Sequence, residues 1–243
     1  MEKHNPIVEL DKICFSYPEG RRVFQDMTFR LSEGDKIGVI GHNGSGKTTM
    51  LHILMGLLRP DAGTIRLFGE TVETEKGFRR ARQGIGFLFQ NADDQLFCPT
   101  VLEDVAFGPL NLGKSPEEAK EMSYNILSEL NLNGFEGRVT HRLSGGEKKM
   151  VALATILVMK PKVLFLDEPT TGLDEDTILR IMTILNGLDI SYMIVSHEYG
   201  FLARTTTDIF KMKDGNLFYD GPSENLHSHY HRHPMGKAHH EHH

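Results

Sequence analysis

The chain has 243 residues and a formal net charge of −6, with 27 basic and 33 acidic residues. A hydrophobic content of 39% is enough for a globular core, and the acidic balance argues against nucleic acid as a partner. The sequence shows no signal segment and no apolar run long enough to span a bilayer, so we expect a cytosolic protein whose two cysteines, Cys14 and Cys98, stay reduced.

The predicted elements begin with two strands, at residues 8–13 and 23–31, joined by a turn at 17–20. Apolar patterns then predict strands at 35–40, 64–68, 85–89, 163–166 and 192–195, helices at 48–58, 73–82, 147–159 and 176–188, and a terminal hairpin at 209–219. Between residues 100 and 142 the strand pattern stops, and a helix is predicted at 116–130, with Ser115 as its cap and Pro116 at its first position. This order predicts an α/β core with a mainly parallel sheet, an N-terminal antiparallel β-subdomain and an inserted helical subdomain at about 100–158.

A glycine-rich stretch separates the strand at 35–40 from the helix that follows. It fits the phosphate-binding pattern G-x-x-x-x-G-K-[ST], in the strand-to-helix context that this pattern requires. Its glycines let successive backbone N–H groups point inward, and the helix N-terminus adds a partial positive charge. Lys47 is expected to reach the β- and γ-phosphates of ATP, and the Thr48 hydroxyl to ligate Mg²⁺. The residues of this loop are Gly41, His42, Asn43, Gly44, Ser45, Gly46, Lys47, Thr48 and Thr49.

Further polar residues follow other predicted strands. Asp167 and Glu168 end the strand at 163–166, and we expect Asp167 to bind Mg²⁺ and Glu168 to act as general base. His197 follows the strand at 192–195 and could hydrogen-bond the γ-phosphate or the attacking water. Gln90 follows the strand at 85–89 and could contact both Mg²⁺ and water. Taken alone, the two acids could equally cap the next helix, and a single histidine after a strand is more often structural.

The order of these motifs resembles that of the ATP-binding cassette (ABC) ATPases over about residues 7–222, within an expected ATPase domain at 7–226. The resemblance rests on residues 41–49, Gln90, the signature 143–147 (Leu-Ser-Gly-Gly-Glu), 164–168, 172–174 and His197. It implies a phosphate-loop NTPase fold and a head-to-tail dimer, either a homodimer or a pair of related ATPases, with ATP between the subunits. Ser144, Gly145 and Gly146 would then contact the γ-phosphate of the ATP held by the other subunit. Similarity also places Tyr17 against adenine and Asp174 near the nucleotide.

Residues 91–109 carry a closer resemblance, to the ATPases of energy-coupling-factor transporters, as does the pair Lys148–Lys149 after the signature. In that group the segment shapes a groove for helices of the membrane partner, which places the ATPase on the cytoplasmic face of the cell membrane. Acidic residues beside Leu96 and Phe97 could receive a basic helix with an apolar face. These residues are Asp93, Asp94, Glu103 and Asp104. The simpler alternative is a surface loop followed by a helix start.

Residues 227–243 contain eight of the 13 histidines and almost no apolar residue, so we expect a disordered tail. Clustered imidazoles are good ligands for nickel, cobalt, zinc and copper, so the tail suggests possible transition-metal binding and resemblance to a cobalt or nickel uptake ATPase. A solvated extension that binds metal incidentally stays open. Two other functions also stay open: the ATPase of another ABC transporter, and a soluble ATPase acting on nucleic acid or ribosomes.

Overall fold

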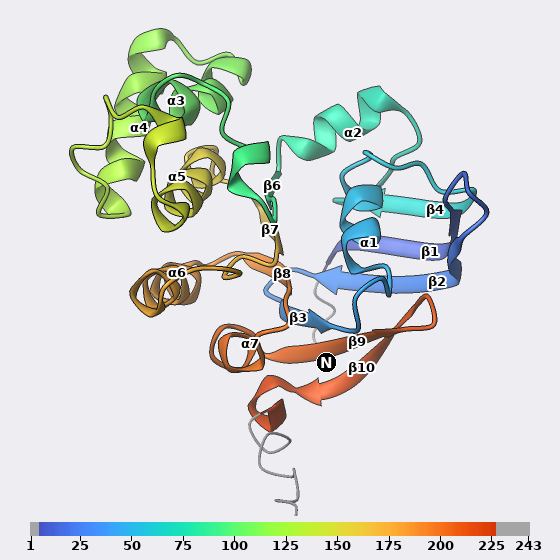
Figure 1. The fold of residues 1–243 in the computed structure, drawn as a ribbon. Coiled ribbons are helices and arrows are strands. Elements are labelled where there is room, and N and C mark those ends of the chain that lie inside the picture. The colour runs from blue at the N-terminus through green and yellow to red at the C-terminus, as the bar shows by residue number, and fades with distance from the viewer. Residues whose placement is uncertain (1–4, 227–243) are drawn as a thin grey trace, which may run out of the picture.

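The computed structural model describes residues 5–226, and its N-terminal part is a four-stranded antiparallel sheet (Figure 1). The strands lie in the order β2-β1-β4-β5, and Leu10 of β1 pairs with Phe29 of β2 and Ile65 of β4. The expected antiparallel start is confirmed, and the strand predicted at 64–68 joins this sheet. The bounds are β1 (Pro6–Ser16), β2 (Arg22–Ser32), β4 (Ala62–Leu67) and β5 (Glu70–Thr71).

A six-stranded sheet forms the centre of the molecule, in the order β10-β9-β3-β8-β7-β6. All neighbours in it are parallel except the terminal hairpin of β9 and β10. β6, β7 and β8 are buried along their whole length, as expected for parallel strands covered on both faces. The bounds are β3 (Lys36–Ile40), β6 (Ile85–Leu88), β7 (Val163–Asp167), β8 (Ser191–Val195), β9 (Asp208–Lys213) and β10 (Asn216–Pro222).

Helices cover both faces of the central sheet (Figure 1). α1 (Lys47–Leu54) lies between the two sheets, where Met50, Leu51 and Leu54 are fully buried in a core shared with both. The other face carries α5 (Gly145–Leu157), α6 (Glu175–Gly187) and α7 (Tyr199–Thr205), which share a second core with α3 (Val101–Asn111) and α4 (Pro116–Glu129). α2 (Glu75–Arg82) is short and largely exposed. Among residues 5–226, no helix is long and apolar enough to cross a bilayer.

α3, α4 and α5 gather at one side of the molecule, and each begins with a capping box (Figure 1). Ser115 caps α4 and Pro116 occupies its first turn, as the sequence predicts. The limits proposed for an inserted helical subdomain, about 100–158, enclose these three helices and stay a prediction. The histidine-rich tail lies outside the described residues.

Several local features differ from the sequence-based expectation, and two of them have a clear physical reason. α1 ends at Leu54, four residues early, because Gly56 adopts a left-handed conformation with φ 67°. The amide of Gly56 donates to Ile53 O and that of Leu57 to His52 O, which is the hydrogen-bond pattern of a Schellman motif. α7 was not predicted, because its seven residues are too few to show a helical period.

Candidate functional site

Four neighbouring parallel strands, β3, β8, β7 and β6, end at the same edge of the central sheet, and the predicted polar residues follow these ends. A cavity of about 720 Å³ lies there. Its lining brings together Tyr17, Asn43, Gly44, Gly46, Lys47, Thr48, Thr49, Gln90, Asp167, Glu168 and His197 from the predicted set. The topology therefore assembles in one cavity residues that are up to 180 positions apart (17 to 197) in the sequence.

The N-terminus of α1 faces this cavity without a side-chain cap from any described residue. Gly46 occupies the cap position with φ 110°, and a Cβ there would lie 2.8 Å from both Phe24 and Val23. Only glycine is compatible with that conformation and that contact. Because no side chain accepts from the first amides of the helix, they can bind an anion in the cavity.

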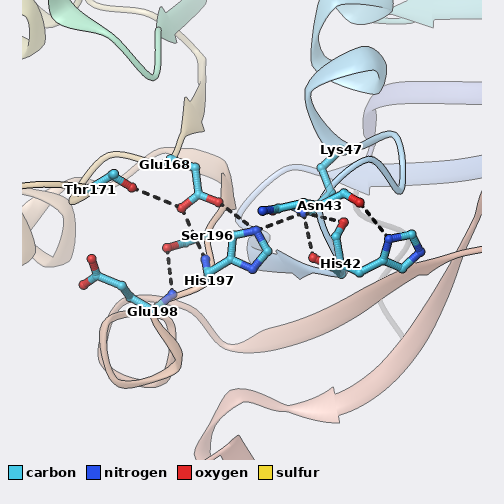
Figure 2. Close-up of polar contacts among 9 residues, drawn as sticks. His42, Asn43, Lys47, Glu168, Thr171, Ser196, His197 and Glu198 are labelled. Atoms are coloured by element: carbon cyan, nitrogen blue, oxygen red, sulfur yellow. Dashed lines mark hydrogen bonds and ion pairs between the residues drawn. The ribbon is translucent and has the colours of Figure 1, made fainter.

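Lys47 is 7% exposed, and its ammonium points back along the loop (Figure 2). Its Nζ donates to Gly41 O at 2.7 Å and His42 O at 3.2 Å, and lies 3.3 Å from His197 Nε2. Burial lowers the pKa of Lys47, while the carboxylates of Glu168 and Asp167 oppose this shift. An anion in the cavity would offer this cation a stronger partner than the two carbonyl groups.

Asp167 is 2% exposed, and its Oδ1 has no hydrogen-bond partner among residues 5–226. Burial raises its pKa, and a hydrogen bond with Thr48 is the largest opposing effect. A buried carboxylate oxygen without a partner is costly unless a ligand satisfies it. Thr48 and Gln90 add two oxygen donors to the same cavity, a set that suits Mg²⁺. In the described part of the chain, no cluster of three or more His, Cys, Asp or Glu residues forms an alternative metal site.

Glu168 and His197 contact each other directly (Figure 2). Glu168 Oε1 lies 3.4 Å from His197 Nε2, and its Oε2 accepts from the His197 amide at 3.3 Å. Glu168 has φ 45°, a conformation that L-residues other than Asn and Asp rarely adopt. Its amide donates to Val195 O at 2.8 Å, which fixes this strained residue, directly after the end of β7, to the last residue of β8. Strain of this kind concentrates at functional sites.

The cavity also contains residues that the sequence did not single out, namely Arg21, Thr171 and Glu198. Arg21 donates from Nη2 to Gly44 O at 2.6 Å, so it holds the glycine loop from the β1–β2 turn. Thr171 donates to Glu168 Oε2 at 3.5 Å. None of the three belongs to a motif that a single sequence reveals. Tyr17 lines the cavity, with its hydroxyl 3.0 Å from Thr49 Oγ1 and its ring edge-on to Phe15.

Three loop residues and the signature do not line the cavity. Gly41, His42 and Ser45 belong to the loop but not to the lining, although Lys47 bonds the carbonyls of the first two. Ser144, Gly145 and Gly146 begin α5 outside the cavity of their own chain. Asp174 caps α6 through Thr177 and lies beside Gly146, where a Cβ would be 3.4 Å from Asp174 Oδ2.

The acidic groove expected around residues 93–104 needs one correction. Asp104 is only 3% exposed, because its Oδ1 turns inward to accept from the amides of Phe97 and Cys98. It therefore adds no surface charge. Asp94 and Glu103 are exposed, and Asp93 pairs with Lys148 at 2.6 Å.

Apolar rings are exposed next to these acids. Phe97 is 65% exposed and Phe107 is 45% exposed, and the two rings pack edge to face with centroids 4.8 Å apart. The described surface thus combines an aromatic pair with acidic side chains.

Comparison with known proteins gives consistent matches. The sequence profile of the family described as ABC transporter matches residues 24–171. A relative from Nitratidesulfovibrio vulgaris, provisionally named an ABC transporter ATP-binding protein, is 52% identical over 98% of this chain and 87% of its own length. The energy-coupling factor transporter ATP-binding protein EcfA of Methanothermobacter thermautotrophicus is 43% identical over 88% of this chain and 70% of its own.

Two solved structures share the fold. One is cbiO1 from Clostridium perfringens, described as part of the ABC transporter complex cbiONQ, with TM-score 0.82 and 31% identity over 93% of this chain and 92% of that one. The other is the ATP-binding cassette MJ0796, a dimer in a post-hydrolysis state bound to ADP and Pi, with TM-score 0.80 and 26% identity over 88% of this chain and 98% of that one.

Proposed function

Because the chain belongs to the ABC transporter family and is an ATPase of that family, we propose that it is the ATP-hydrolysing subunit of an energy-coupling-factor importer for cobalt or nickel. The observation that carries the proposal is the cavity at the sheet edge, where an uncapped helix N-terminus, a buried lysine and two adjacent carboxylates converge. This combination suits phosphoryl transfer from ATP to water.

The phosphates of ATP bind at the N-terminus of α1. The open amides after Gly46 bind the phosphate oxygens, and Lys47 leaves the carbonyls of Gly41 and His42 to contact the β- and γ-phosphates. Tyr17 belongs to the same lining, and its ring stacks on adenine. Loop residues His42, Asn43, Ser45 and Thr49 shape this binding site through their backbone.

Thr48, Gln90 and Asp167 would hold Mg²⁺, and the unpartnered Oδ1 of Asp167 is the feature that fits a cation. When bound, Mg²⁺ would neutralise charge on the β- and γ-phosphates. Because Asp167 is buried with a raised pKa, a cation nearby favours its ionised form.

Glu168 takes a proton from the attacking water at a carboxylate oxygen, while the water oxygen bonds to the γ-phosphorus, the bond from that phosphorus to the β–γ bridging oxygen breaks, and ADP leaves. His197, in contact with both Glu168 and Lys47, orients that water and the γ-phosphate. The hydrogen bonds from Thr171 and the His197 amide keep the carboxylate of Glu168 in place. In this proposal Lys47 binds phosphate, Thr171 and the His197 amide hold the carboxylate of Glu168, and that carboxylate accepts one proton.

A second copy, or a related ATPase, supplies Ser144, Gly145 and Gly146 in the ATP-bound dimer. These residues lie outside the cavity of their own chain, and apart from its chain neighbours and the backbone of its own helix, no described heavy atom comes within 4 Å of a Cβ placed on Gly145. The dimeric MJ0796 cassette supports the assembly. Asp174 lies beside Gly146 of the signature, so in the dimer it would lie near the nucleotide bound by the partner.

The aromatic pair Phe97 and Phe107, with the exposed acids Asp94 and Glu103, receives a basic helix of the membrane partner. This contact holds the subunit peripherally at the cytoplasmic face of the cell membrane. The similarity to EcfA supports this partner, and the histidine-rich sequence at 227–243 supports cobalt or nickel as cargo.

The test is affinity capture from detergent-solubilised native membranes, followed by reconstitution of the captured complex into liposomes. We expect membrane subunits to copurify and ATP-dependent uptake of labelled cobalt or nickel, with no uptake for the complex made with E168Q. As a matched pair, F97D should lose the membrane subunits and keep ATPase activity, whereas exposed Y124D on α4 should keep both. Uptake of another solute would change the cargo, and capture of nucleic acid or ribosomes without membrane protein would overturn the proposal.

A further inference from the structure

Lys149 lies one turn into α5, after the signature, and is 3% exposed. We propose that Lys149 is a positioning residue that couples the signature end of α5 to Gln90, so that occupation of one ATP site of the dimer controls Gln90 in the other. The inference rests on the proposed function, in which the signature contacts the ATP of the partner and Gln90 serves the site of its own chain.

The contacts of Lys149 lead directly to Gln90. Its Nζ donates to Gln90 O at 2.6 Å and to Phe89 O at 3.1 Å. These carbonyls directly follow the end of β6, where the chain leaves the sheet. A charge-assisted hydrogen bond of this length fixes the backbone of Gln90 and thereby the starting point of its side chain.

Keeping an ammonium at this position is costly. Burial lowers the pKa of Lys149 to about 8, with the carboxylate of Asp167 opposing the shift. An apolar residue would fill the same volume without desolvating a charge, and it would leave the two carbonyls without this donor. The contact to the loop is therefore what distinguishes lysine from a packing residue here.

Two other side chains connect the same loop to α5. Gln95 accepts from the Phe89 amide at 3.3 Å and donates to Ala152 O at 2.8 Å and Thr155 Oγ1 at 2.9 Å. Lys148 pairs with Asp93 at 2.6 Å. Residues 89–95 are thus attached to α5 at three points, so a displacement of the helix moves the loop with it.

Hydrogen bonds stabilise α5 between the signature at its start and Lys149 one turn later. Ser144 and Glu147 form a capping box at its start, and Arg138 bonds both carboxylate oxygens of Glu147 at 2.7 and 3.2 Å. Lys149 follows Ser144 by five residues, about 7.5 Å along the axis at about 1.5 Å per residue. A contact at the signature therefore reaches Gln90 through one short, hydrogen-bonded segment.

The test compares steady-state ATP hydrolysis by the full chain with that of K149M, K149R, Q90A and the double variant Q90A/K149M. We expect K149M to lower kcat about tenfold, within the usual range of coupling energies, while KM for ATP changes less than about twofold. The Hill coefficient for ATP should exceed 1 in the unaltered protein and fall to 1 in K149M. K149R, which keeps the charge and the donors, should restore most of both quantities, and K120M on the surface of α4 serves as control.

The double variant separates coupling from independent effects. If Lys149 acts through Gln90, Q90A/K149M should hydrolyse ATP no more slowly than Q90A alone. Any of four results would overturn the inference. They are multiplicative losses of activity in the double variant, an unchanged Hill coefficient in K149M, a Hill coefficient of 1 in the unaltered protein, and normal activity of Q90A. If K149M fails to fold, K149Q and K149R decide the same question. Failure of the proposed function would instead appear as full activity of E168Q or as the absence of membrane subunits after capture.

Discussion

The chain contains two glycine-rich helix starts that are built in opposite ways. α1 begins with Gly46 in a left-handed conformation, has no side-chain cap among the described residues and opens into the cavity. α5 begins with Ser144, whose hydroxyl accepts from the Glu147 amide while the carboxylate of Glu147 accepts from the Ser144 amide. The first amides of α1 therefore have no side-chain acceptor among the described residues, whereas at the start of α5 the capping box satisfies the amides of Ser144 and Glu147.

This difference suits the ligands proposed for the two helix starts, which are the ATP of the same chain for α1 and the ATP of the partner subunit for α5. The start of α1 is enclosed with Lys47, Asp167 and Glu168, so it can bind and process a nucleotide within one chain. The start of α5 is preformed and faces away from that cavity, as required for a surface that meets a phosphate only when a second subunit arrives.

The largest effect is expected at the α1 end, from E168Q. Loss of the proton acceptor should reduce ATP hydrolysis by about 10²- to 10⁴-fold and leave ATP binding intact. Phosphate release and equilibrium nucleotide binding measure the two properties. E129Q, at the exposed end of α4, is the matched control. Normal turnover in E168Q would remove Glu168 from its proposed role.

D167N removes the buried charge next to Glu168. It should raise the Mg²⁺ concentration needed for half-maximal ATP hydrolysis by at least about tenfold. D104N is a close control, because Asp104 is also buried, has a raised pKa and carries an oxygen without a described partner, but lies outside the cavity. Because burial raises both pKa values, the destabilisation that each carboxylate causes is present at neutral pH and relieved as the pH falls. Both variants should therefore unfold at a higher temperature without ligand, and only D167N should change the Mg²⁺ requirement.

At the α5 end, G145D places a carboxylate opposite the phosphate of the partner. We expect ATP binding by the single chain to persist and ATP-dependent dimerisation to weaken at least about tenfold, about 1.4 kcal/mol. Sedimentation with ATP present separates monomer from dimer, and comparing E168Q with G145D/E168Q measures the loss of dimerisation. G187D makes the same change at another helical glycine whose Cβ position has no described heavy atom within 4 Å apart from its chain neighbours and the backbone of its own helix. A dimer that tolerates G145D would contradict the assignment of the signature to the partner.

The smallest effect is expected from E147Q, which keeps the capping box and removes only the charge. Arg138, and next the Ser144 amide, hold the pKa of Glu147 down to about 2, below its ordinary 4.5. Its stabilising effect is therefore present above about pH 4.5 and lost as the pH falls toward 2. Since the pair is partly exposed, E147Q should cost less than about 1 kcal/mol at pH 7. In chemical denaturation, that difference should disappear in acid.

The convergence of residues around the start of α1 could be predicted from the sequence because each of them follows a strand. Once the parallel order was expected, the loop at 41–49, Gln90, Asp167 and His197 had to meet at one sheet edge, and the structure places them there. The fold class follows from the same alternation and is confirmed.

The features that sequence reasoning missed depend on contacts between distant segments. Arg21 reaches the loop only because the β1–β2 turn folds over it, and Asp104 turns inward only because residues 97 and 98 present free amides to it. The contact of Lys149 with residues 89 and 90 spans about 60 positions. No periodicity or local motif encodes such contacts, so they appear only in three dimensions.

The left-handed backbone of Glu168 has a consequence for how the protein can change. A residue with a Cβ in this conformation costs about 1–2 kcal/mol, which glycine would avoid. Substitution by glycine should therefore stabilise the fold while removing the carboxylate that the proposed reaction needs. Screens for thermostable variants of this protein should therefore select substitutions at position 168. Those variants should be more stable but inactive in ATP hydrolysis.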